Sequence, residues 1–322
     1  MPDLTKTTAA SESTDEQTVT PDAPVDAIAA GPAPGKPRSL WNDAWRELRR
    51  NPLFVISAFL IVILLVVAAF PGLFTDANPD SGDQVNHFLG KPELTHFFQA
   101  DWFGYDRVGR SIYSRVVHGA RNSILVGVGV TILVTLFGGL CGMLAGYFGG
   151  FWDSLISRLT DVFFGIPFLL GAMVVLNAFT DRTVWVVMGA LAFLGWTQIA
   201  RVMRGAVITT KHADYVVAAR ALGAGTKRIL FRHILPNALA PVIVVATISL
   251  GTYIVAESTL SYLGLGLGDG AISWGGDISD ATQDIRNNPH TLFFPAGMLS
   301  ITVLAFIMMG DAVREALDPK LR

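Results

Sequence analysis

Ionisable side chains inside apolar runs are the first residues of this chain that could carry chemistry. Asp161 and Glu257 both stand in such runs, and a carboxylate in the middle of a bilayer costs about 3 kcal/mol. Asp161 follows Arg158 by one helical turn, so we expect the two charges to neutralise each other near a helix end. For Glu257 two interpretations stay open: a carboxylate that faces a cavity or a partner, or one that is solvated at the membrane interface.

Motifs for metal, phosphate or nucleophile chemistry are missing from the sequence. His233 has no second His, Cys or acid at ligand spacing, so we expect it to cap a helix or brace a loop. The run GPAPGK at 31–36 is one residue too short for a phosphate loop, and Pro37 replaces the required Ser or Thr. No His-Glu-x-x-His pair and no Gly-x-Ser-x-Gly elbow occurs. We therefore expect no metal site, no bound cofactor and no enzyme activity in this chain.

The composition indicates an integral membrane protein. Hydrophobic residues make up 51% of the 322 residues and charged residues 16%. A membrane-spanning helix needs about 20 mostly apolar residues. Six segments meet this condition: Pro52–Phe74, Asn122–Tyr147, Leu155–Phe179, Val184–Ile208, Pro236–Ser258 and Leu292–Ala312. The predicted fold is all-α with six transmembrane helices, and the net charge of −2 argues against a nucleic-acid partner.

The distribution of Lys and Arg predicts the orientation. They gather before the first segment, around the loop between the fourth and fifth, and after the last: Arg46, Arg49, Arg50, Arg201, Arg204, Lys211, Arg220, Lys227, Arg228, Arg232, Arg314, Lys320 and Arg322. By the positive-inside rule these regions, and both termini, are cytoplasmic. The 75–121 region also holds five basic residues, which is a weaker and contrary signal.

These patterns divide the chain into five parts. We predict a disordered cytoplasmic tail (1–37), a basic amphipathic lead-in with the first span (38–74), an extracytoplasmic loop (75–121), a core of five spans (122–312) and a cytoplasmic C-terminus (313–322). Four glycines at intervals of four, Gly138, Gly142, Gly146 and Gly150, predict a helix face that packs closely on another helix. Pro167 should kink the third span, and Pro236 suits the first turn of the fifth.

The loop between the fourth and fifth spans has an unusual composition. Small apolar residues from Tyr215 to Leu222 precede a bend at Gly223 and Gly225, and a basic helical pattern follows. We expect two short helices joined by the bend, which form a compact knob at 211–235. This knob either rests on the underside of the protein itself or offers a docking surface to a cytoplasmic partner.

The same loop resembles a known family motif. The stretch AARALGAGTKRILFRHILPN is similar to the EAA loop of ABC importer permeases, with matches at Ala218, Ala219, Gly223, His233, Leu235, Pro236 and Asn237. Val217 stands where the motif glutamate falls. The resemblance implies a helix that couples the permease to an ATPase subunit. The residues expected to take part are Tyr215, Val217, Ala218, Ala219, Arg220, Gly223, Arg228, His233, Pro236 and Asn237.

Further motifs resemble the C-type permease subunit of dipeptide and oligopeptide importers. They are WRELRRNPLFVISAFLIV, GYDRVGRSIYSRVVHGARNSILVG, AGYFGGFWDSLISRLTDVFFGIPFLL, AESTLSYLGLGLG with SWGG, and GDAVREALDP, in the family's order. The resemblance implies a type I ABC importer permease in the bacterial cytoplasmic membrane. It implies as partners a second permease, one or two ATPases that bind ATP and Mg, an extracytoplasmic peptide-binding protein and membrane lipid.

The sequence leaves the cargo and two rival classes open. Asp106, Arg110, Glu257 and Trp274 are the residues expected to line the pathway or contact the binding protein. A permease for nickel or another small solute is the alternative within the family. An ion-coupled transporter would use Asp161, Arg158 and Glu257 as a relay, but six spans and few buried charges speak against it. An intramembrane enzyme would need one of the missing motifs.

Overall fold

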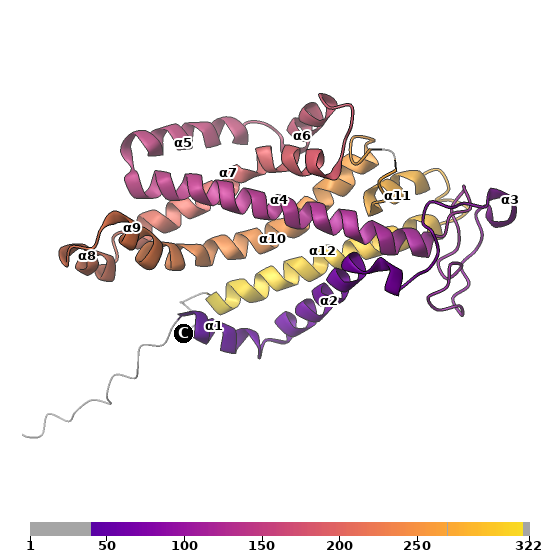
Figure 1. Ribbon diagram of the computed structural model, residues 1–322, viewed down its shortest axis with the longest axis horizontal. Helices are drawn as coiled ribbons and strands as arrows, with labels where there is room; N and C mark the ends of the chain where they lie inside the picture. Colours follow the sequence, from indigo (N-terminus) through magenta and orange to yellow (C-terminus); the bar gives the residue numbers. More distant parts are fainter. Residues whose placement is uncertain (1–39, 269, 318–322) are drawn as a thin grey trace, which may run out of the picture. The chain divides into compact units, whose positions relative to one another are not determined.

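The computed structural model describes residues 40–268 and 270–317, so the predicted tail at 1–37 and the second half of the predicted C-terminal segment, 318–322, lie outside the described residues. The described chain is built from helices (Figure 1). They are α1 (Leu40–Leu48), α2 (Pro52–Ala69), η1 (Pro71–Leu73), α3 (Gln84–His87), α4 (Ile112–Phe148), α5 (Gly150–Phe164), α6 (Phe168–Asn177), α7 (Val184–Thr210), α8 (Asp214–Ala221), α9 (Thr226–Arg228), η2 (Ile229–Ile234), α10 (Leu235–Tyr262), α11 (Trp274–Ala281) and α12 (His290–Leu317).

Five helices of the described part are long and apolar enough to cross a membrane. They are α2, α4, α7, α12 and the continuous helix Thr226–Tyr262, which combines α9, η2 and α10. The pair α5 and α6 passes the same test together and gives a sixth span if the bent pair is counted as one. In Figure 1, α8 and α9 lie at one end of this bundle, while α3 and α11 lie at the other. We call these the α8 end and the α11 end.

The second predicted span differs from the observed helix at its start. The hydroxyl of Ser111 accepts a hydrogen bond from the backbone N–H of Ser114 at 3.2 Å, which caps α4 at Ile112. The helix therefore starts ten residues before Asn122, and the end of the predicted 75–121 loop is helical. A prediction based on hydropathy missed residues 112–121, because Arg115 and Arg121 lower the mean hydropathy of this stretch.

The third predicted span is broken rather than continuous. α5 and α6 meet at an angle of 87° across the short break around Gly165 and Pro167. Pro167 precedes α6 and has no N–H to continue the hydrogen-bond ladder of α5. The kink expected at Pro167 is present, and it is large enough to turn one span into two short helices.

The glycine face predicted on the second span packs against α7. A Cβ atom at Gly138 would meet the carbonyl oxygen of Trp196, and one at Gly142 would meet that of Ala200. A Cβ atom at Gly146 would lie 2.9 Å from the Cβ of Val207. The two backbones can approach because these positions carry no side chain. Gly150 does not belong to this face, since it begins α5 with φ +53° and has open space around its Cα.

The buried apolar residues form two clusters. The larger one joins α4, α7 and α10 and includes Val130, Ile199 and Val242. The smaller one joins α2, α4 and α12 and includes Leu64 and Trp274. The larger cluster extends to the α8 end through Val216 and Ile234, whereas Trp274 brings α11 into the smaller one. Both ends of the bundle are therefore tied to its core.

Candidate functional sites at the two ends of the bundle

The bend predicted at Gly223 closes α8 with a specific hydrogen-bond pattern. The N–H of Gly223 donates to the carbonyl of Arg220 at 3.0 Å, and the N–H of Ala224 donates to that of Ala219 at 3.1 Å. Gly223 has φ +79°, as this type of helix ending requires. The chain turns back at this point, and Val216 is fully buried beside Ile229 and Ile234 in the larger core cluster.

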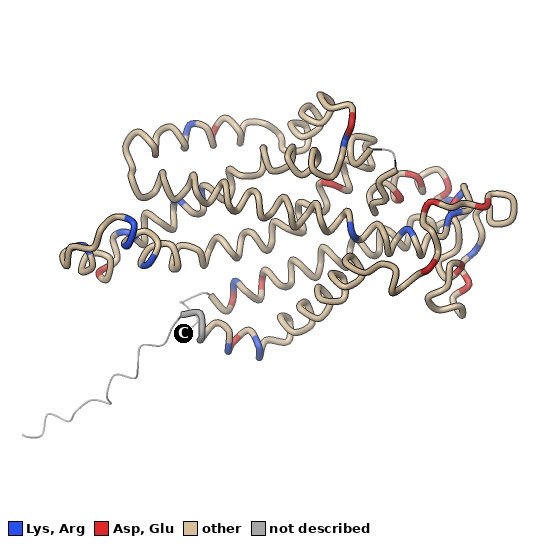
Figure 2. The backbone as a smooth tube through the Cα atoms, viewed as in Figure 1, with Lys and Arg blue, Asp and Glu red and all other residues tan. Residues whose placement is uncertain are grey.

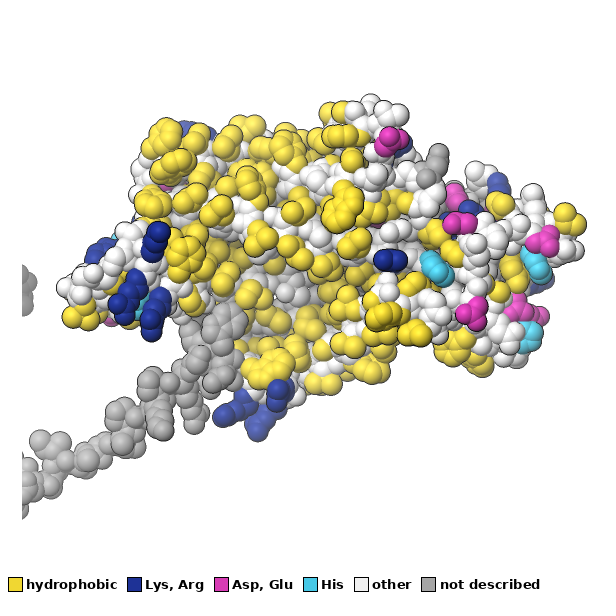
Figure 3. All heavy atoms as spheres, viewed as in Figure 1, with side chains coloured by type: hydrophobic (Ala, Val, Ile, Leu, Met, Phe, Trp, Pro, Cys, Tyr) yellow, Lys and Arg dark blue, Asp and Glu magenta, His cyan; other side chains and the backbone are white. Residues whose placement is uncertain are grey.

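The outer surface of this segment combines apolar and basic side chains. Tyr215 is 46% exposed, Val217 52% and Leu222 89%. Arg220, Lys227, Arg228 and Arg232 are also exposed. Figures 2 and 3 show Lys and Arg gathered at the α8 end, next to the apolar middle of the bundle. We call residues 214–234 the coupling segment; it rests on the protein through one face and offers a second, mixed face to its surroundings.

The coupling segment continues directly into α10. Residues Ile229–Ile234 form a π-helix, after which Pro236 occupies the first turn of α10. The wider π turn suits a site where proline cannot donate a hydrogen bond. The side chain of Asn237 donates to the carbonyl of His233 at 2.9 Å, so both motif residues brace this junction. Pro236 lies in the first turn of α10, as the sequence predicts, and α8 is the first of the two short helices expected. The second is not a separate helix, because α9 and η2 run on into α10 as the continuous helix Thr226–Tyr262.

An ion-paired network lies at the α11 end. Arg110 pairs with Asp106 at 2.6 Å and with Asp280 of α11 at 3.4 Å. Arg107 pairs with Asp284 at 2.8 Å and also donates to Gln283. Asp106 and Arg110, both singled out from the sequence, therefore lie together. Arg110 connects the 75–111 loop to α11, and Arg107 connects it to the segment that follows α11.

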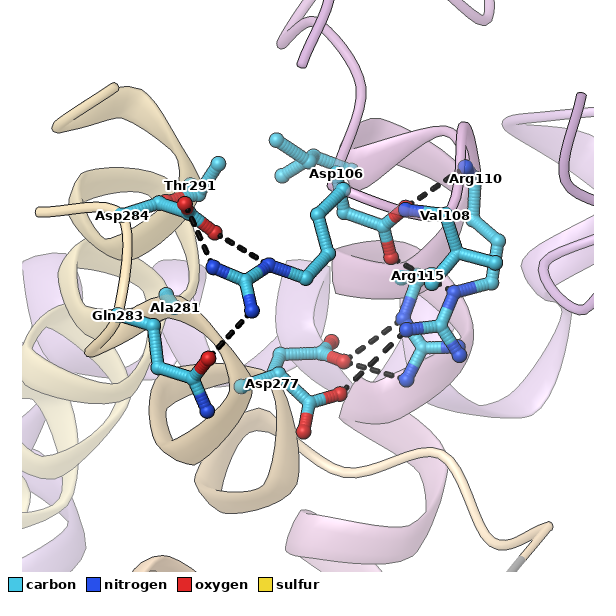
Figure 4. A pocket seen from close by; sticks show the side chains of 12 residues that line it. Asp106, Val108, Arg110, Arg115, Asp277, Ala281, Gln283, Asp284 and Thr291 are labelled. Carbon is cyan, nitrogen blue, oxygen red and sulfur yellow. Dashed lines mark hydrogen bonds and ion pairs between the residues drawn. The ribbon is translucent and has the colours of Figure 1, made fainter. Parts of the chain in front are cut away.

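A pocket of about 190 Å³ opens in the middle of this network (Figure 4). Its floor includes Arg115 of α4 and Asp277 of α11, which form an ion pair at 2.5 Å. Burial raises the pKa of the Asp277 carboxyl to about 6, although the nearby guanidinium of Arg115 opposes this shift. The second carboxylate oxygen of Asp277 is buried without a hydrogen-bond partner. Asp277 is thus a buried carboxylate with one unpaired oxygen, and Arg115 favours its charged form.

Trp274 and Glu257 lie beneath this network in one buried polar cluster. The indole N–H of Trp274 donates to the carbonyl of Val116 at 2.9 Å, and its backbone N–H donates to the Ser123 hydroxyl at 3.3 Å. Ser123 in turn donates to Glu257 at 3.4 Å, and Ser261 donates to Glu257 at 2.8 Å. Both Trp274 and Glu257 are 0% exposed.

This burial changes the interpretation of Glu257. The sequence left open a carboxylate that faces a cavity or a partner, or one that is solvated at the interface, and the fully buried Glu257 side chain does none of these within this chain. It is enclosed by hydroxyl groups of α4 and α10, and Ser123 also accepts a hydrogen bond from the N–H of Trp274 at the start of α11.

Sequence reasoning missed several members of the α11-end network. Arg107 was counted only as a basic residue that contradicts the predicted topology, Arg115 was also matched to a family motif but given no role, and the acids of α11 were not considered. A signal did exist: Asp277, Asp280 and Asp284 are spaced by three and four residues, so they share one face if the stretch is helical.

The predicted pairing of Asp161 with Arg158 is wrong. Asp161 of α5 pairs with Arg201 of α7 at 3.3 Å. A second pair joins the same helices, because Arg204 donates to Asp153 at 2.8 Å. Arg158 and Asp161 are neighbours on one helix, but the opposite charge nearest to Asp161 comes from a helix that the sequence could not place.

Metal binding finds no support in the described part of the chain. Within residues 40–268 and 270–317, no group of three or more His, Cys, Asp or Glu side chains is arranged to hold a metal ion.

Comparison with known proteins gives two family matches. Residues 138–322 match the model described as "Binding-protein-dependent transport system inner membrane component". Residues 39–92 match "N-terminal TM domain of oligopeptide transport permease C".

Three curated relatives match most of the chain. The oligopeptide transport system permease protein OppC of Bacillus subtilis is 37% identical and covers 89% of this chain and 92% of its own length. The dipeptide transport system permease protein DppC of Alkalihalophilus pseudofirmus is 36% identical, covering 88% and 91%. The glutathione transport system permease protein GsiD of Escherichia coli O6:K15:H31 is 36% identical, covering 90% and 93%.

Fold and matches together define an all-α, multi-pass membrane protein of the type I ABC importer permease kind. The chain belongs to the family of binding-protein-dependent transport system inner membrane components.

Proposed function

We propose that this chain is one of two permease subunits of an ATP-driven importer for dipeptides or oligopeptides. The family match supports transport that depends on a binding protein. The three relatives named above are permeases for oligopeptides, dipeptides and glutathione, and each covers about nine-tenths of this chain. All three cargoes are short peptides, which favours a peptide over nickel or another small solute.

The coupling segment is the observation that carries the proposal. Its exposed apolar side chains and exposed basic side chains form one surface at the α8 end of the bundle. Such a surface suits a protein partner that has an apolar groove with acidic edges. We assign this partner as the ATPase subunit, which binds ATP and Mg; the permease itself binds neither.

The orientation follows from this assignment. The α8 end, with the coupling segment, faces the cytoplasm, and both termini lie on that side of the bacterial cytoplasmic membrane. The α11 end then faces outward, where Asp106, Arg110 and the loop that contains α11 meet the binding protein. A second permease subunit completes the pathway, and lipid covers the remaining apolar surface.

α10 connects the two ends mechanically. It begins at the coupling segment and carries Glu257 about 33 Å further along, at 1.5 Å per residue over the 22 residues from Leu235. Glu257 holds Trp274 through Ser123, so displacement of α10 reaches the start of α11. Closure of the ATPases thereby moves the outer loops, as alternating access requires.

Purification of the chain with its companions tests the proposal. We expect a second permease, one or two ATPases, and ATP hydrolysis that rises when a peptide-loaded binding protein is added. The substitution Ala218→Arg places a large charge on the exposed face of α8 and should abolish recovery of the ATPase. Val85→Arg, at a position 92% exposed at the α11 end, is the matched control and should retain it.

The possible outcomes separate the parts of the proposal. Recovery of the chain without an ATPase, or an A218R complex that keeps its ATPase and transports normally, contradicts the docking assignment. An ATPase that responds to a nickel-loaded binding protein but not to a peptide-loaded one moves the cargo to the alternative.

A further inference from the structure

Two exposed charged side chains face each other between α5 and α7. Asp161 of α5 is 60% exposed and Arg201 of α7 is 52% exposed, although both helices lie in the segments suited to cross a membrane. Figure 2 shows charges along α5 between the two charged ends of the bundle. Placing a charged side chain against lipid tails costs free energy. This face of α5 and α7 therefore lines a water-filled space or a protein surface.

A pocket of about 240 Å³ lies at this position, between α5 and α7. It is lined by Asp161, Arg201 and Arg204, by the hydroxyl residues Ser157 and Thr160, and by Ile156 and Ala200. The pocket thus holds one carboxylate, two guanidinium groups and two hydroxyl residues. Both signs of charge are present within one small volume.

The two ion pairs between α5 and α7 differ in how firmly they are made. Arg204 donates two hydrogen bonds to Asp153, and both side chains are about one-third exposed or less. Asp161 and Arg201 share one contact of 3.3 Å, and more than half of each side chain is exposed. An exposed pair with a single contact is weak. Asp161 and Arg201 can therefore exchange each other for charges of a ligand.

The surroundings of Arg201 hold its guanidinium at the edge of the pocket. Its guanidinium carbon lies 3.9 Å above the ring of Phe164, at the last residue of α5. The break of 87° between α5 and α6 follows directly. Broken helices are common next to the substrate sites of membrane transporters. A change of the bend at this break would move Asp161 and Phe164 relative to Arg201.

We infer that this pocket is a cargo site on the translocation pathway, which takes the terminal ammonium of a short peptide on Asp161 and its carboxylate on Arg201. This inference rests on the proposed function and names the chemistry of the cargo within it. The volume is below the ~300–1,000 Å³ of pockets for drug-sized ligands, so the site fits a dipeptide. A zwitterion replaces the internal ion pair with two new ones, and no charge is left unpaired.

The test uses the complete transporter complex in proteoliposomes, with radiolabelled alanyl-alanine loaded on the binding protein. The quantity measured is the number of dipeptides carried per ATP hydrolysed. For Asp161→Asn and for Arg201→Gln we expect this ratio to fall at least tenfold. Asp311→Asn is the control, because it neutralises an exposed carboxylate on α12 that does not line the pocket. Its ratio should change less than twofold.

Each result decides something. A tenfold loss in both variants, with D311N near the wild type, supports the site. An unchanged ratio in D161N and R201Q, or an equal loss in D311N, overturns it, since the pair would then be irrelevant or the loss unspecific. These failures leave the proposed function intact as long as the wild type carries the dipeptide. A wild-type complex that hydrolyses ATP but carries no dipeptide contradicts the proposed peptide cargo, and the inference falls with it.

Discussion

Arg115 of α4 and Asp277 of α11 form an ion pair of 2.5 Å in which each side chain is 9% exposed. The two residues are 162 positions apart in the sequence. The pair fastens the loop that contains α11 to α4, and the network around it connects the segments at the α11 end.

Loss of Arg115 should destabilise this end more than loss of its exposed neighbour. Arg115→Gln leaves the carboxylate of Asp277 buried without its cation, which costs about 3–5 kcal/mol. Arg107→Gln removes a partner from an ion pair in which the arginine is 44% exposed, so we expect a much smaller cost, because solvent screens an exposed pair. Thermal unfolding of the two purified variants at pH 7 measures the difference. Equal midpoints for both variants would contradict the assignment of Arg115 as a buried partner.

The raised pKa of Asp277 predicts a pH dependence of stability. The pKa is about 6 in the folded chain against 3.8 as the ordinary value. Between these values the folded state binds more protons than the unfolded state, so this group makes stability fall as pH rises from about 4 to about 6, with no further change above. Asp277→Asn should remove this contribution. The measurement is the difference in unfolding midpoint between pH 4.5 and 7, taken for the wild type and D277N; identical differences would refute the prediction.

The close approach of α4 and α7 should not tolerate a side chain at Gly142. A Cβ there would meet the carbonyl oxygen of Ala200 and lie 2.9 Å from the Cβ of Met203. Gly142→Val therefore forces the helices apart, at a cost of about 3 kcal/mol. Gly205→Val on α7 is the control, because nothing lies within 4 Å of its Cβ position. Size-exclusion profiles and unfolding midpoints should separate the two; a stable, monodisperse G142V protein would show that the packing is looser than the structure has it.

The two glycines of the coupling segment should differ in their tolerance of alanine. Gly223 has φ +79°, a conformation that costs an L-residue about 1–2 kcal/mol. Gly225 has φ −68°, and neither position is crowded. Gly223→Ala should therefore speed hydrogen exchange of the amides that close α8 and weaken recovery of the ATPase. Gly225→Ala should leave both measurements near the wild type. The same exchange rates in both variants would mean that the bend does not depend on the left-handed residue.

Local features of the fold follow from short stretches of sequence. The spanning helices follow from runs of apolar residues, because burying apolar side chains in lipid requires no knowledge of the neighbouring helices. The bend at Gly223, the kink at Pro167 and the close packing at Gly138 and Gly142 follow from the geometry of glycine and proline alone. The motifs of the sequence likewise indicated the family to which the chain belongs.

Pairings between distant residues depended on the tertiary structure. Asp161 pairs with Arg201 and not with Arg158, because ion pairing depends on the distance between the charges in space and not on their separation along the chain. Glu257 is enclosed by hydroxyl groups of α4 and α10, and no local sequence pattern predicts this contact between the two helices. The sequence by itself determined which segments enter the membrane and where the chain bends. Only the tertiary structure decided which charges meet, because the partners of a long-range contact come from helices whose packing is set by all the side chains together.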